Sequence, residues 1–149
     1  MNLHGVIPQS PVVILGSGDL GMIMAAQVVN AGGQAVLLEQ NDVCGGMERN
    51  RCKIEELSVP VILHTTIVEV YGEKEINHVK LTNGTVLPCK TLLIAVGLCP
   101  NRELLQNLGS PDWLHLCGNC SRVHAMIESV VYEGKNAGLA ACRQLRGVK

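Results

Sequence analysis

Short apolar runs recur along the first two thirds of the chain, and each is long enough for one strand. The runs cover residues 12–15, 35–38, 61–63 and 92–96. They are rich in Val, Ile and Leu and show no alternation with polar residues. Continuous runs of this kind are typical of strands that are buried on both faces, as in a parallel sheet.

Two segments between these runs have the pattern of helices. Residues 20–30 carry apolar side chains at helical spacing, and Ala31-Gly32-Gly33 ends the pattern. Residues 47–57 are charged and compatible with a second helix, which Pro60 closes. Strands that alternate with helices predict βαβ units and a parallel sheet.

The pattern changes from Thr66 onward. Three β-prone segments, residues 67–70, 76–81 and 86–89, follow one another closely. Asn83-Gly84 separates the last two, and both residues tolerate the positive φ angles that a tight hairpin requires. We therefore expect a three-stranded antiparallel meander, inserted before the last strand of the parallel sheet.

The C-terminal third predicts a separate unit. It contains a short helix at residues 102–108, a strand at 113–117 and a long helix at 123–145. The predicted fold class is therefore α/β: a Rossmann-like parallel sheet with flanking helices, an inserted antiparallel β-meander and a C-terminal strand–helix unit. We expect one domain at residues 8–100 and a second segment at 101–149.

Composition and charge exclude several classes of partner. The chain has 149 residues, of which 47% are hydrophobic and 17% charged, and its formal net charge is −1. A balanced charge argues against a nucleic-acid partner or an anionic membrane surface. We find no apolar stretch of about 18 residues and no signal peptide, and the seven cysteines are an odd number. A reduced, cytoplasmic setting without a membrane is expected.

One motif carries recognisable chemistry. Gly16-Ser17-Gly18-Asp19-Leu20-Gly21 is a G-x-G-x-x-G sequence that follows a predicted strand and opens a predicted helix. In that context the first glycine permits a sharp turn, the second lets the backbone approach a pyrophosphate, and the third allows close packing of helix and strand. The start of the helix offers unpaired N–H groups to the phosphates. These six residues predict a dinucleotide site.

Glu39 and Gln40 extend this prediction. Glu39 ends the second predicted strand, where an acidic residue can accept hydrogen bonds from the ribose hydroxyls of the adenosine. A carboxylate repels a 2′-phosphate, and no Arg follows within the next several residues. NAD(H) is therefore the expected nucleotide, in preference to NADP(H). The alternative is a glycine turn with a surface glutamate that lies nearby by chance.

Taken together, these features resemble the FAD-dependent pyridine nucleotide-disulfide oxidoreductases. Residues 95–101, Ala-Val-Gly-Leu-Cys-Pro-Asn, match the A-x-G-x-x-P-N signature that closes the NAD domain of that family. Residues 114–120 are similar to its strand–C-G-D–helix flavin motif. The resemblance implies that Ala95 and Gly97 line the nicotinamide side of the site and that Gly118 and Asn119 contact FAD. The resemblance also implies that hydride passes from NADH to FAD in an intact enzyme.

The departures from the family pattern shape further expectations. Asn119 replaces the usual Asp, and Ile23 replaces a Glu that is often present beside the nicotinamide. The first FAD-binding unit of the family is missing, so we expect a fragment, or a chain that works with an FAD domain or a partner subunit. An alternative is a non-catalytic NAD(H)-binding module. Apolar positions along residues 123–145 favour a homodimer.

The cysteines and histidines leave two interpretations open. Cys117 and Cys120 form a C-x-x-C, which is compatible with a redox dithiol or with a packed loop facing the flavin. Together with His115 and His124 they do not have the spacing of a familiar zinc motif, so no metal is expected. The other five cysteines are expected to be buried as small apolar side chains. No residue is assigned a catalytic role.

Overall fold

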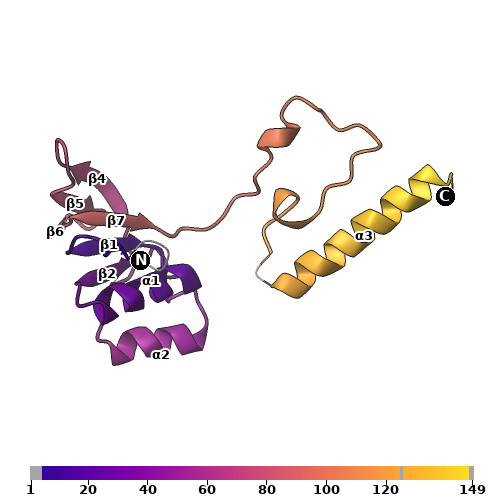
Figure 1. The fold of residues 1–149 in the computed structure, drawn as a ribbon. Helices are drawn as coiled ribbons and strands as arrows, with labels where there is room; N and C mark the ends of the chain where they lie inside the picture. The colour runs from indigo at the N-terminus through magenta and orange to yellow at the C-terminus, as the bar shows by residue number, and fades with distance from the viewer. Residues whose placement is uncertain (1–4, 125, 148–149) are drawn as a thin grey trace. The chain divides into compact units, whose positions relative to one another are not determined.

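The computed structural model describes residues 5–124 and 126–147. The chain forms two compact units, Met1–Gly97 and Leu98–Lys149 (Figure 1). Among the described residues, all strands belong to the first unit. The second unit consists of connecting segments, two short 3-10 turns and one long helix.

Four short strands of the first unit form a parallel sheet in the order β3-β2-β1-β7. They are β1 (Val12–Leu15), β2 (Ala35–Leu38), β3 (Val61–Ile62) and β7 (Thr91–Ile94). Val12, Val13 and Ile14 of the central strand β1 are fully buried. Their burial on both faces explains why the strand lacks polar residues, and the prediction of a parallel sheet is confirmed.

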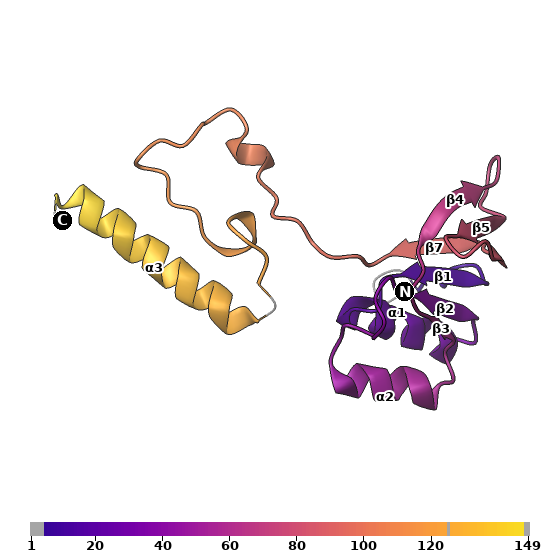
Figure 2. The same cartoon turned by 180° about the vertical axis from the view of Figure 1, so that it is seen from behind.

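Helices α1 (Asp19–Asn30) and α2 (Glu48–Glu56) connect β1 to β2 and β2 to β3. Both lie on the same face of the parallel sheet, and the second sheet lies on the other face (Figures 1 and 2). Helix α1 packs through Met22, Ala25 and Val28, all fully buried beside Val12 and Ile14. It ends where Gly32 takes a φ of +83°, a conformation that glycine adopts without strain.

The meander forms a separate antiparallel sheet of β4 (Ile67–Tyr71), β5 (His78–Leu81) and β6 (Val86–Pro88). Gly84, at a φ of +84°, closes the predicted Asn-Gly turn. Val79 and Leu81 are buried against Val13 and Leu38 of the parallel sheet. Together the two sheets and the flanking helices confirm the predicted α/β class.

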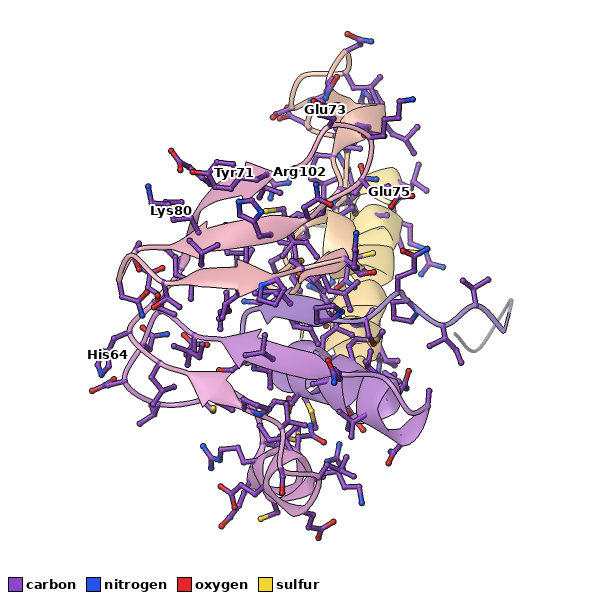
Figure 3. The ribbon with its side chains drawn as sticks, turned by 90° about the vertical axis from the view of Figure 1, so that its left-hand side faces the viewer. His64, Tyr71, Glu73, Glu75, Lys80 and Arg102 are labelled. Atoms are coloured by element: carbon purple, nitrogen blue, oxygen red, sulfur yellow. The ribbon has the colours of Figure 1, made fainter. Side chains whose placement is uncertain are left out.

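The exposed surface of the meander carries polar side chains as well as the exposed Val68, Val70 and Val86. Tyr71 and Lys80 lie near each other on it (Figure 3), and both donate hydrogen bonds to Glu69. The Tyr71 ring stacks on the His78 ring, with 4.4 Å between centroids. Alternating polar and buried residues along β5 therefore follow the two faces of the sheet.

The second unit differs from its prediction in three ways. Residues 113–117 form no strand, and the predicted helix at 102–108 is only a 3-10 turn, η1 (Glu103–Leu105). The long helix, α3 (Ile127–Leu145), begins after the predicted start at 123, because a second 3-10 turn, η2 (Gly118–Cys120), and a bend come first. A strand needs a neighbour for its backbone hydrogen bonds, and the described part of this unit contains no other strand.

Helix α3 has no buried residue within its described span. Its most exposed apolar side chains are Ile127, Val131, Tyr132 and Leu145. The homodimer that we expected from this helix stays a prediction. The expectation of buried cysteines was wrong for Cys52, Cys99 and Cys142, which lie at exposed positions on helices and a connector, whereas Cys89 is buried and Cys44 is half-buried.

Candidate functional site

An open cavity of about 370 Å³ lies where strands β1, β2 and β7 end. It is lined by Leu15, Gly16, Ser17, Gly18, Leu38, Glu39, Gln40, Asn41, Thr66, Ala95, Val96 and Gly97. In open α/β sheets, ligands bind outside the carboxyl ends of the strands, where the connections of neighbouring strands diverge. Here β1 connects onward to β2 on one side and has β7 on the other, so the cavity has the expected location.

The three glycines of the G-x-G-x-x-G loop have different surroundings. A Cβ at Gly16, whose φ is +103°, would overlap the carbonyl oxygen of Ala95. A Cβ at Gly21 would overlap the carbonyl oxygen of Gly16. At Gly18 a Cβ would meet nothing within 4 Å. The fold therefore requires glycine at positions 16 and 21. At position 18 the space beside the cavity is empty, so the fold would also accept a side chain there.

Ser17 connects the glycine-rich loop to the segment after β2. Its side chain is fully buried, and its backbone N–H and its hydroxyl both donate to Glu39 Oε2, at 3.0 and 2.5 Å. The hydroxyl also accepts a bond from the N–H of Gly45 at 3.2 Å, and the Ser17 carbonyl accepts the N–H of Gly46 at 3.2 Å. These bonds hold the two loops together at the edge of the cavity.

Glu39 is a buried carboxylate with four donors. Its relative exposure is only 7%, yet it lines the cavity. Oε2 accepts the two bonds from Ser17, while Oε1 accepts the backbone N–H of Asn41 at 2.9 Å and its Nδ2 at 2.7 Å. Burial opposes ionisation of Glu39, but the bonds from Ser17 and Asn41 outweigh it and lower the pKa of the carboxyl.

The lowered pKa makes the stability of this region depend on pH. A group whose pKa is depressed in the folded state contributes stability above its unfolded pKa and loses it as the pH falls through the folded value. We expect the difference in unfolding free energy between the wild type and Glu39→Gln to be largest at neutral pH. This difference should become smaller at pH values below 4.5, the ordinary pKa of a glutamate. Urea unfolding followed by circular dichroism at a series of pH values measures this difference.

Glu56→Gln is the matched control for the pH series. Glu56 is exposed on α2 and pairs only with Lys53 among the described residues, at 3.0 Å. Exposed pairs of this kind contribute little to stability. Its variant should therefore unfold like the wild type at every pH. A difference for Glu39→Gln that stays constant across the series would contradict the assignment.

The structure brings together seven of the twelve predicted site residues. The cavity lining includes Gly16, Ser17, Gly18, Glu39, Gln40, Ala95 and Gly97. Asp19, Leu20 and Gly21 follow in the same loop and helix but do not line it. Asp19 instead accepts hydrogen bonds from Met47 N at 2.7 Å and from Asn50 Nδ2 at 2.6 Å. The bond from Met47 is the main reason that the pKa of the Asp19 carboxyl is lowered.

Sequence reasoning did not identify five lining residues. They are Leu15, Leu38, Asn41, Thr66 and Val96. Leu15, Leu38 and Val96 are sequence neighbours of the predicted residues Gly16, Glu39 and Ala95. Their place near the ends of predicted strands could have identified them as lining residues. Thr66 comes from the start of the meander, and no local pattern connects it to the glycine-rich loop. Asn41 is the polar residue two positions after Glu39, and its role depends on where its side chain turns.

Gly118 and Asn119 belong to the second unit. The N–H of Gly118 donates to Glu133 Oε2 at 2.8 Å, and Asn119 Oδ1 accepts the N–H of His124 at 3.2 Å. His124 Nε2 lies 2.5 Å from Glu133 Oε2, and this hydrogen bond is the main reason that the pKa of Glu133 is lowered. Gly118 has a φ of +67°, so the tight turn at the start of η2 favours glycine.

Cys117 and Cys120 lie on the same turn. The thiol of Cys120 donates to the carbonyl oxygen of Cys117 at 3.0 Å, and both residues are half-buried. The redox interpretation of this pair stays a prediction. Within residues 5–124 and 126–147, no three His, Cys, Asp or Glu side chains are grouped as metal ligands would be, and no helix is both long and apolar enough to cross a membrane.

Comparison with known proteins places these features in a family. The sequence profile described as pyridine nucleotide-disulphide oxidoreductase matches residues 3–112. A probable ferredoxin reductase, CtmF of Castellaniella defragrans, is 30% identical over 105 residues, which are 65% of this chain and 26% of that protein. The chain therefore spans about a quarter of the length of this relative.

Solved structures share the fold. Thioredoxin reductase of T. acidophilum aligns with 87% of this chain and 51% of its own, at a TM-score of 0.73 and 22% identity. Thioredoxin reductase of Lactococcus lactis aligns with 92% of this chain and 55% of its own, at a TM-score of 0.72 and 17% identity. A ferredoxin reductase of Rhodopseudomonas palustris aligns with 67% of this chain and 27% of its own, at a TM-score of 0.58 and 24% identity.

Proposed function

The chain belongs to the pyridine nucleotide-disulphide oxidoreductase family, and we propose that it is the NAD(H)-binding part of a flavin-dependent oxidoreductase that passes hydride from NADH to FAD. Residues 8–100 form the nucleotide-binding domain in this proposal, and residues 101–149 correspond to the end of an FAD-binding domain. The observation that carries it is the single cavity lined by Gly16, Gly18 and Glu39.

The glycine-rich loop fits a pyrophosphate. The φ of Gly16 allows the turn, and the absence of a side chain at Gly18 leaves the backbone accessible. Helix α1 begins directly after Gly18, so its first N–H groups and the positive end of its dipole lie at the loop. Asp19 is turned toward Met47 and Asn50, which keeps its negative charge bonded on the side of α2.

Glu39 fits the adenosine ribose. Its carboxylate lies at the cavity and has a lowered pKa, so it is ionised at neutral pH. An ionised carboxylate accepts bonds from hydroxyl groups and repels a 2′-phosphate. This supports NAD(H) as the nucleotide rather than NADP(H).

Ala95 and Gly97 line the same cavity from the end of β7. The sheet places them beside Gly16 because Ala95 N donates to the carbonyl of Leu15 at 2.8 Å. We assign this side to the nicotinamide half of the nucleotide. FAD, when bound, supplies the group that accepts the two electrons, and Gly118 with Asn119 are the residues of this chain that we propose to contact it.

Calorimetric titration of the chain with NADH and with NADPH tests the proposal. We expect saturable binding of NADH and at least about tenfold weaker binding of NADPH, the effect of about 1.4 kcal/mol of repulsion and lost hydrogen bonding at Glu39. Lys74→Ala, on the exposed hairpin between β4 and β5, is a control for charge effects outside the cavity. No binding of NADH, or equal binding of NADPH, would contradict the proposal.

A further inference from the structure

The donors around Glu39 occupy its full capacity as an acceptor. Ser17 supplies two of them to Oε2, and Asn41 supplies two to Oε1. An ionised carboxylate offers about four acceptor positions. A ribose hydroxyl can therefore bind to Glu39 only if one of these donors leaves.

Two of the four donors are backbone N–H groups, and the chain holds them in place. The N–H of Ser17 lies within the glycine-rich loop, where the neighbouring carbonyl and N–H groups bond to Gly46 and to Leu38. Asn41 lies in the loop after β2, and its own carbonyl accepts the N–H of His64 at 3.2 Å. Moving either donor would break other backbone bonds as well.

The two side-chain donors differ in what their departure costs. The Ser17 hydroxyl is fully buried and also accepts the N–H of Gly45. Its rotation would leave the buried hydroxyl without its Glu39 acceptor and would break the bond from Gly45 as well. Asn41 is exposed, and within the described residues its Nδ2 has Glu39 as its one partner. Water can satisfy the Asn41 amide once it turns away.

We propose that the side-chain amide of Asn41 occupies, in the free protein, the position on Glu39 Oε1 that a ribose hydroxyl of the nucleotide takes in the complex. This inference rests on the proposed NAD(H) site. The Asn41 amide then keeps the buried carboxylate hydrogen-bonded when the cavity holds no nucleotide, and the nucleotide displaces it on binding. Binding replaces one neutral donor on Oε1 by another.

The exchange makes Asn41 a residue that limits affinity. Each molecule of NADH must break the bond from Asn41 Nδ2 before it gains its own bond to Glu39. In Asn41→Ala the acceptor position is free, while the backbone N–H at residue 41 still holds the carboxylate. We expect NADH to bind about three- to tenfold more tightly to this variant, the size of one net hydrogen bond. NADPH should gain less, because its 2′-phosphate still meets the Glu39 carboxylate.

Calorimetric titration of the wild type, Asn41→Ala and Asn77→Ala with NADH and NADPH tests the exchange. Asn77 is an exposed asparagine of the same unit that lies outside the cavity, and its variant should bind like the wild type. Thermal unfolding of each variant verifies that it is folded. Asn41→Ser, which has a side chain too short to reach Glu39 in the same way, should show the same gain as Asn41→Ala.

The outcomes separate the two proposals. If the wild type does not bind NADH, the proposed function is wrong. If the wild type binds NADH but the folded Asn41 variants bind it equally or more weakly, the exchange is wrong and Asn41 acts as a positioning residue or a direct contact. A rise in the NADH-to-NADPH affinity ratio that is confined to the Asn41 variants supports the exchange, because a general loosening of the loop would weaken both nucleotides.

Discussion

Replacement of Gly21 by alanine is expected to lower the unfolding free energy of the first unit by about 3 kcal/mol, the upper part of the range for overpacked sites. The added Cβ would overlap the carbonyl oxygen of Gly16. That atom belongs to the backbone of the glycine-rich loop, so no flexible side chain can yield. For a unit of this size, such a loss corresponds to a decrease in Tm of about 12 °C or more.

Gly18→Ala is the matched variant in the same loop. Gly18 has a φ of −66°, which alanine adopts without strain, and its Cβ would meet nothing within 4 Å. Its stability should stay within about 0.5 kcal/mol of the wild type. Its affinity for NADH should nevertheless fall at least about tenfold, because the methyl group enters the space through which the backbone approaches the pyrophosphate.

Thermal unfolding of both variants measures the effect of each substitution on stability, and calorimetric titration measures its effect on NADH affinity. A Gly21→Ala variant as stable as the wild type would show that α1 can shift away from the loop. If the Gly18→Ala variant binds NADH as tightly as the wild type, the pyrophosphate does not bind at this loop. Either result is decisive because the two glycines lie only three residues apart.

Replacement of Glu39 by alanine is expected to weaken NADH binding by about 1.5–3 kcal/mol, which is roughly tenfold or more. The same variant should also lose stability, because the buried N–H and hydroxyl of Ser17 lose their acceptor. An unsatisfied buried donor costs about 1–3 kcal/mol. The preference for NADH over NADPH should decrease, since the charge that repels the 2′-phosphate is gone.

Glu39→Gln separates these two effects. Glutamine keeps the size of the side chain and one acceptor oxygen, so it should retain part of the bonding to Ser17 while losing the negative charge. We expect its nucleotide preference to resemble that of Glu39→Ala and its stability to lie between alanine and wild type. Titration and urea unfolding of the three proteins measure both quantities. An unchanged preference in both variants would show that Glu39 has a structural role alone.

The sequence by itself determined the order of strands and helices in the first unit and the position of its glycine-rich loop. The apolar runs, the glycine motif and the Asn-Gly turn are local signals, because burial on both faces, a positive φ and a tight turn each restrict which residues are allowed at that position. These restrictions predicted the parallel sheet, the meander and seven of the lining residues, including Glu39 at the end of β2.

Only the tertiary structure decided the bonding around Glu39 and the form of the C-terminal unit. Ser17 and Asn41 donate hydrogen bonds to Glu39, and Gly45 donates to the Ser17 hydroxyl. These contacts depend on side-chain rotamers and loop packing, which the periodicity of the sequence does not predict. Residues 113–117 have the composition of a strand but form none, because a strand depends on backbone bonds to a second strand. Local residue preferences determine which conformations are possible, and non-local hydrogen bonds determine which of them form.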